Sequence, residues 1–179
     1  MAQKKKGGGG KLSRSETVTV RLDPKLRFAA ELAARKQRRT LSSFIEWAVE
    51  ESIHKVILVE SSSYTNEPPE TAYTAIERVW DVDEADRFAK FALNYPNLLT
   101  HNEEILWKLI CENGCLWKGR PENGEWTWEI SQGSLIFKRL REYWQTFKKV
   151  ATGEMDKGQL PTGLKEIKVK EEKNDDIPF

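Results

Sequence analysis

Three polar side chains near the start of the chain alternate with apolar ones and are suited to bind a ligand. They are Thr17, Thr19 and Arg21, and the residues that follow each of them are Val18, Val20 and Leu22. In an extended strand successive side chains point to opposite faces, so this stretch would have a polar face and an apolar face. Threonine can bond a base edge in the major groove of DNA, and arginine can bond guanine through two N–H groups. We therefore predict that Thr19 and Arg21 read DNA bases.

A second polar group has the residue types of a phosphate-binding helix start. Thr40 is a good N-cap, and the first turn of the helix after it would leave backbone N–H groups without partners. Such groups attract phosphate, and neighbouring arginines and serine hydroxyls would add to the attraction. We predict phosphate binding by Arg38, Arg39, Thr40, Leu41, Ser42 and Ser43.

The elements that would position these residues follow from capping and periodicity. Residues 16–22 read as a strand, and Asp23 with Pro24 then begins a helix over residues 24–37. A second helix follows Thr40, with apolar residues at helical spacing as far as Val56. A lone strand cannot satisfy its hydrogen bonds, and no second strand is evident nearby, so we expect it to pair with a second copy of the chain. The predicted dimer core consists of Val18, Val20, Leu22, Phe44, Ile45, Ala48 and Val49.

Residues 16–56 resemble the ribbon-helix-helix family of Arc-type, MetJ-type and CopG-type repressors. The matching stretches are Thr17 to Pro24, the alanine-rich helix, and Arg39-Thr40-Leu41-Ser42-Ser43-Phe44-Ile45. The resemblance implies a homodimer whose paired strands enter the major groove, with Thr17, Thr19 and Arg21 as the base-reading side chains. One departure is Gln37-Arg38-Arg39, where many members have glycine between the helices. The alternative is a helical hairpin with an extended lead-in that serves only dimerisation.

The charge is unevenly distributed along the chain. Residues 1–40 contain 12 Lys or Arg and three acids, whereas the remaining residues contain 17 basic and 25 acidic side chains. Such an imbalance suggests a polyanion-binding segment joined to a part with another task, although a basic arm can also be merely solvated. Residues 1–15 are Lys- and Gly-rich and read as a disordered basic arm.

The rest of the chain reads as a second domain of mixed structure. After a ribbon-helix-helix domain over residues 16–58, residues 59–71 read as a linker and residues 72–152 as an α+β domain. Asp83, Thr100 and Ser134 would begin helices, and Asn113-Gly114 would end one in a left-handed conformation. Leu116 to Ile130 reads as a β-hairpin turning at Asn123-Gly124, and residues 153–179 as a disordered tail. The predicted fold class is therefore mainly α with minor β. We recognise no family for residues 72–152.

Six of the seven tryptophans fall in this second domain. Tryptophan faces can stack on single-stranded bases, but the hairpin is acidic, which favours core packing and a surface for a protein partner. Cys111 and Cys115, with His101 upstream, are too few to make a structural zinc site, so we expect reduced cysteines and no metal.

Motifs typical of catalysis are absent from the sequence: there is no GxSxG, P-loop, HExxH or Gly-rich dinucleotide turn. We therefore expect no enzymatic activity and no cofactor. With no apolar run long enough to span a membrane and no apolar core to a secretory signal, we expect a cytoplasmic protein with no membrane partner.

These features together predict a homodimeric, sequence-specific DNA-binding transcriptional regulator, a repressor that occupies a palindromic or tandem operator. The expected partners are double-stranded DNA, a second copy of the chain with higher oligomers on DNA, and a protein bound through residues 72–152. Three alternatives stay open. The chain could be an antitoxin whose C-terminal region binds a toxin, or a plasmid or mobile-element maintenance or relaxosome accessory protein. It could also be a dimeric protein-interaction module that does not bind DNA.

Overall fold

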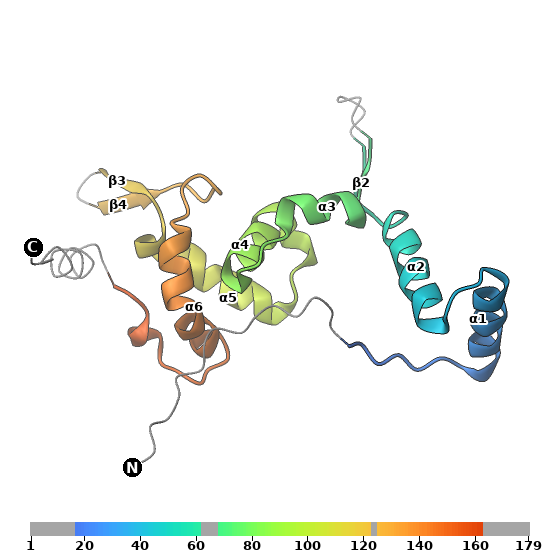
Figure 1. The fold of residues 1–179 in the computed structure, drawn as a ribbon. Helices are drawn as coiled ribbons and strands as arrows, with labels where there is room; N and C mark the ends of the chain where they lie inside the picture. Colours follow the sequence, from blue (N-terminus) through green and yellow to red (C-terminus); the bar gives the residue numbers. More distant parts are fainter. Residues whose placement is uncertain (1–16, 62–67, 123–124, 163–179) are drawn as a thin grey trace, which may run out of the picture. The chain divides into compact units, whose positions relative to one another are not determined.

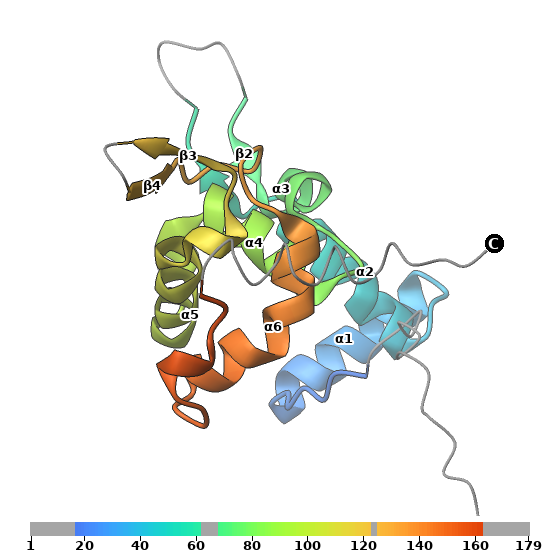
Figure 2. The same ribbon diagram turned by 90° about the vertical axis from the view of Figure 1, so that its left-hand side faces the viewer.

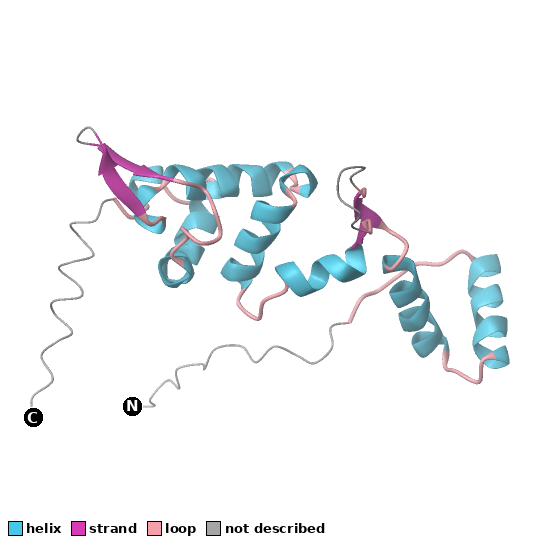
Figure 3. Cartoon of the chain, turned by 90° about the horizontal axis from the view of Figure 1, so that it is seen from above, coloured by secondary structure: helices cyan, strands magenta, loops and turns pink. Residues whose placement is uncertain are grey.

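The computed structural model describes residues 17–61, 68–122 and 125–162, and these are mainly helical. They form six α-helices and two small two-stranded antiparallel sheets (Figures 1 and 3). The predicted fold class, mainly α with minor β, is confirmed at this level. The chain divides into two compact units, residues 1–77 and residues 78–179, which we describe separately. No helix in the described part is long and apolar enough to cross a membrane.

The N-terminal unit begins with two helices joined by a short turn, α1 (Pro24–Lys36) and α2 (Leu41–Ile53). Asp23 caps α1 as predicted, because its carboxylate accepts the backbone N–H groups of Lys25 and Leu26 at 2.9 and 3.1 Å. Pro24 occupies the first helical position, where a missing N–H costs nothing. The second helix is shorter than the apolar pattern suggested, since it ends at Ile53 and leaves Val56 outside.

The turn between the helices keeps the left-handed residue that glycine usually supplies. Arg38 has φ 55°, and it lies in a Schellman-type closure of α1. The N–H of Arg39 bonds the carbonyl of Ala34 at 2.9 Å, and the N–H of Arg38 bonds that of Arg35 at 3.1 Å. The departure from glycine therefore leaves the turn intact, at a cost of about 1–2 kcal/mol for the left-handed arginine.

A small sheet and most of a third helix complete the N-terminal unit. Strands β1 (Ile57–Val59) and β2 (Glu70–Thr71) pair antiparallel, with Ile57 opposite Thr71. Strand β2 lies in the stretch that is predicted as a linker, residues 59–71, and α3 (Ala72–Val79) follows it directly. The His54 ring stacks on Tyr73 with centroids 3.8 Å apart, so the end of α2 contacts the start of α3.

The C-terminal unit has a core enclosed by three helices, α4 (Glu84–Asn94), α5 (His101–Glu112) and α6 (Phe137–Ala151) (Figure 2). A short 3-10 turn follows each of them, at Pro96–Leu98 (η1), Gly114–Leu116 (η2) and Lys157–Gln159 (η3). Asp83 and Thr100 begin α4 and α5 as predicted. The buried side chains are Ala85, Ala89, Leu106, Leu109, Ile110, Leu116, Trp117, Leu135, Leu140, Trp144, Phe147 and Leu160.

The predicted hairpin is present as β3 (Gly119–Glu122) and β4 (Glu125–Trp128), which pair antiparallel from Gly119 opposite Trp128. Its first strand begins later than predicted because Leu116 and Trp117 turn into the core. The Trp117 side chain is fully buried, and its Nε1–H donates to the carbonyl of Ile110 at 2.8 Å. The predicted turn residues Asn123-Gly124 lie outside the described residues.

Three local predictions in this unit are wrong because tertiary contacts override the local sequence signals. Neither Asn113 nor Gly114 has a positive φ; a Cβ on Gly114 would instead lie 2.8 Å from the Trp128 ring, so close packing requires glycine there. Helix α6 begins at Phe137, and the Ser134 hydroxyl closes the preceding loop by donating to the Ser131 carbonyl at 2.9 Å.

The third wrong prediction is that residues 153–179 form a disordered tail. Leu160 is only 7% exposed and packs in the core. The Asn113 side-chain amide donates to the Pro161 carbonyl at 3.1 Å, which fixes this segment against the end of α5. Residues 153–162 therefore belong to the folded unit, and residues 163–179 lie outside the described part.

Candidate nucleic-acid interface

The three predicted base-reading residues lie in the segment that leads into α1. Thr17, Thr19 and Arg21 are all exposed. Residues 17–23 belong to no strand in the single chain, since none of the described strands pairs with them. Pairing with a second copy stays a prediction.

The predicted dimer-core residues are incompletely covered in the single chain. Val18, Val20 and Val49 are 80%, 61% and 56% exposed. The other four, which are half-buried, are Leu22, Phe44, Ile45 and Ala48. Among the residues of α1 and α2, Ala34 is the single buried side chain. Since a stable domain normally buries a contiguous apolar core, this helix pair lacks one of its own.

The structure also reveals apolar residues that the sequence pattern did not single out. Phe28 and Leu32 are 58% and 49% exposed on α1. They are four residues apart and so share one side of the helix. The four-residue spacing of Phe28 and Leu32 in the sequence could have identified an apolar side of α1, but the helix prediction rests on the alanines of its other side.

The start of α2 has the geometry predicted for a phosphate-binding helix terminus. The Thr40 hydroxyl accepts the backbone N–H of Ser43 at 3.1 Å, so Thr40 is the N-cap. The N–H groups of Leu41 and Ser42 have no partner within the helix, as in the first turn of any α-helix. The Ser42 and Ser43 side chains are exposed beside them. Together with the helix dipole, these groups favour an anion at this end.

Positive charge is concentrated in the turn just before this helix start. Arg38 and Arg39 are exposed there, and Arg35 and Lys36 form the last turn of α1. The Arg39 guanidinium lies over the Trp47 ring, 5.3 Å from its centroid. The acids of α2, which are Glu46, Glu50 and Glu51, come later in the helix. The turn therefore offers cations and unpaired N–H groups within a few residues of one another.

Neither cysteine of the C-terminal unit is part of a disulfide. Cys111 is half-buried and Cys115 buried. Burial, with a smaller contribution from the Glu112 carboxylate, raises the pKa of the Cys111 thiol to about 11, so it is protonated at neutral pH. His101 is exposed beside Glu104, 3.7 Å away. No group of three or more metal-ligating side chains is assembled in the part of the chain that the structure describes.

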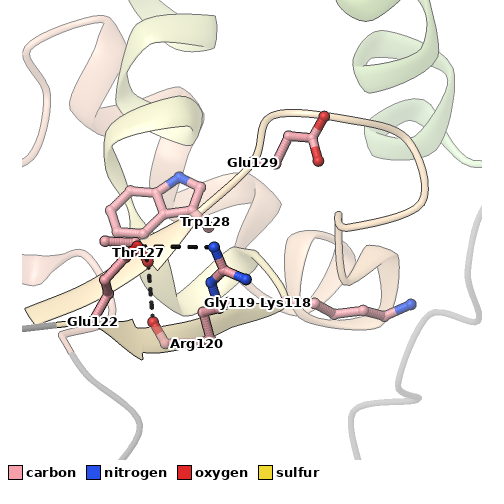
Figure 4. A pocket seen from close by; sticks show the side chains of 7 residues that line it. All are labelled: Lys118, Gly119, Arg120, Glu122, Thr127, Trp128 and Glu129. Carbon is pink, nitrogen blue, oxygen red and sulfur yellow. Dashed lines mark hydrogen bonds and ion pairs between the residues drawn. The ribbon is translucent and has the colours of Figure 1, made fainter.

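A shallow cavity of about 510 Å³ lies along the hairpin of the C-terminal unit (Figure 4). Its charged lining contains both signs, from Lys118, Arg120, Glu122 and Glu129. Part of this lining is already paired: the Lys118 ammonium donates to the Gly133 carbonyl at 3.0 Å. The mixed charge favours neither an anion nor a cation as a ligand.

The tryptophans of the C-terminal unit are mainly structural. Trp117 and Trp144 are buried in the core, and Trp107 and Trp128 pack against it. The Trp128 Nε1–H donates to the carbonyl of Cys111 at 3.0 Å, which ties β4 to the end of α5. Trp80 is the most exposed of them at 54%, with the Arg87 guanidinium over its ring.

No family model, curated protein or solved structure matches this chain.

Proposed function

We propose that this chain is a homodimeric, sequence-specific double-stranded DNA-binding protein that acts as a transcriptional repressor. The observation that carries the proposal is the unfinished core of α1 and α2, which bury Ala34 alone. Val18, Val20 and Val49 are the apolar surface that a second copy would cover. Pairing residues 17–22 of two copies would satisfy their backbone groups and bury both valines at once.

The polar side chains divide naturally into two kinds of contact. In an antiparallel ribbon Thr17, Thr19 and Arg21 would share the face opposite Val18 and Val20, and such a ribbon is narrow enough to enter the major groove. The Thr40-capped start of α2 supplies unpaired N–H groups for phosphate. Phosphate contacts fix the register of the protein on the duplex, and base contacts select the sequence.

The two-fold symmetry of a homodimer would place two such sets of contacts on the DNA. A symmetric dimer matches a palindromic or tandem operator, and occupying it would block access to the promoter. In this proposal the C-terminal unit, residues 78–179, serves a separate partner, because it has a complete core and contributes no residue to the ribbon.

The test uses the purified full-length chain. Its duplex target is first enriched from random DNA, and affinity is then compared between wild type, Arg21→Ala and Arg120→Ala. Arg120 is an exposed arginine of the C-terminal hairpin, so its removal changes net charge equally without touching the ribbon. We expect Arg21→Ala to weaken binding by about 1–3 kcal/mol for each base pair that the arginine reads, and Arg120→Ala to leave it unchanged.

Two results would contradict the proposal. One is equal affinity of wild type and Arg21→Ala for the enriched site. The other is a wild-type chain that shows no duplex affinity, which would favour the protein-interaction alternative.

A further inference from the structure

The residue that precedes the N-cap of α2 is held by an aromatic ring from the same helix. The guanidinium carbon of Arg39 lies 5.3 Å from the centroid of the Trp47 ring, within cation–π range. Trp47 in turn contacts Phe44, with ring centroids 5.6 Å apart. Helical side chains tilt toward the N-terminus of their helix, so the Trp47 indole points back toward the first turn of α2. The contact therefore places the Arg39 charge beside the Thr40-capped helix start.

A guanidinium that lies over one ring can still donate hydrogen bonds elsewhere. Arginine carries five N–H donors in one plane, more than a single ring can occupy. A free arginine side chain loses rotamer freedom when it binds a phosphate, whereas a stacked one has already lost part of it.

We propose that Trp47 is a positioning residue that holds the Arg39 guanidinium next to the N-terminus of α2, ready to bind a DNA phosphate. This inference rests on the proposed DNA binding. It assigns to Trp47 a role that is separate from those of the predicted strand and of the Thr40 cap. Arg38 is a natural comparison: it is exposed, adjacent and equally charged, but its backbone is turned into the left-handed region by the Schellman closure.

The experiment is a double-mutant cycle on the full-length chain and its enriched duplex site. Dissociation constants are measured for wild type, Trp47→Leu, Arg39→Ala and the double variant, at several salt concentrations. We expect Trp47→Leu to weaken binding about 5- to 30-fold, since each of two copies must then immobilise on the phosphate an Arg39 side chain that Trp47 no longer holds. Arg39→Ala should weaken binding at least as much and lower the salt slope by about 0.9 for each phosphate that the arginine neutralises. The double variant should bind no more weakly than Arg39→Ala.

Two controls separate positioning from packing. Trp47→Phe keeps a ring over the guanidinium and should bind within about twofold of wild type. If Trp47→Leu does not dimerise, the double-mutant cycle is measured with Trp47→Phe instead, and a smaller coupling energy to Arg39 is expected. The same cycle with Arg38 in place of Arg39 should be additive. Sedimentation equilibrium is used to check that each variant in the comparison is a dimer.

The possible failures are distinguishable. If Trp47→Leu costs as much in the Arg39→Ala background as in wild type, or couples equally to Arg38, the positioning role is overturned while DNA binding stands. If wild type binds no duplex, the proposed function and this inference fall together.

Discussion

Val20 provides a quantitative test of the homodimer proposed for the N-terminal unit. Its side chain is 61% exposed in the single chain, so pairing with a second copy would cover most of it. Val20→Ala removes two methyl groups, and at about 0.8 kcal/mol per buried carbon the loss scaled by that exposure is about 1 kcal/mol per copy. Two copies lose about 2 kcal/mol, which corresponds to a roughly 30-fold weaker dimer.

The assay is sedimentation equilibrium of the full-length chain over a range of concentrations. Val82→Ala is the matched control, because Val82 is 70% exposed but lies in the C-terminal unit, outside the proposed interface. Thr19→Ala, on the opposite face of the ribbon, should leave the dimer constant unchanged. The reasoning is refuted if Val20→Ala and Val82→Ala give the same monomer–dimer constant, or if wild type is monomeric throughout.

Three further predictions follow from the described contacts. Arg38→Gly should raise the free energy of unfolding by about 0.5–1 kcal/mol, because removing the strain of a left-handed arginine outweighs the entropic cost of glycine. Arg38→Ala keeps that strain and should give no gain. Equal melting temperatures for the two variants would contradict this prediction. Leu160→Ala should lower the free energy of unfolding, measured with urea, by about 2–4 kcal/mol, whereas Leu98→Ala, at an exposed leucine, should lower it by under about 1 kcal/mol. A similar small loss for both variants would place Leu160 outside the core. The Lys90 ammonium, 2.7 Å away, holds the pKa of the Asp81 carboxyl below its ordinary 3.8. The ionised Asp81 carboxylate therefore stabilises the fold above pH 3.8, and this stabilisation is lost as the pH falls from 3.8 through the lower pKa of the folded state. The stability of Asp81→Asn should consequently fall less than that of wild type on acidification. An equal fall of the free energy of unfolding in both proteins would refute the pairing.

The helix starts could be predicted from the sequence because capping is a local interaction. Asp23 and Thr40 each accept backbone N–H groups from residues no more than three positions away. The same holds for Asp83, which accepts the N–H of Ala85. Such contacts depend on residue type and short spacing, so they form wherever the helix forms.

The candidate site was predicted in part. The cap at Thr40 and the basic turn before it follow from neighbouring residues, but the contact between Arg39 and Trp47 spans two turns of helix and was not predicted. The left-handed arginine in the turn was identified as a departure from glycine, and the structure shows that the chain makes the same closure with Arg38. The predicted pairing of residues 17–22 would require a second copy, which the structure of a single chain cannot contain.

The sequence by itself determined helices α1 and α2 with their caps, the alternation of Thr17 to Leu22 and the concentration of positive charge before α2. The tertiary structure decided what the C-terminal unit buries. Leu160 enters the core from a polar stretch, Trp117 leaves the hairpin to bond Ile110, and Gly114 is required by the Trp128 ring rather than by its own φ. These outcomes depend on residues distant in sequence competing for one enclosed volume, and close packing in that volume is not encoded by any local pattern.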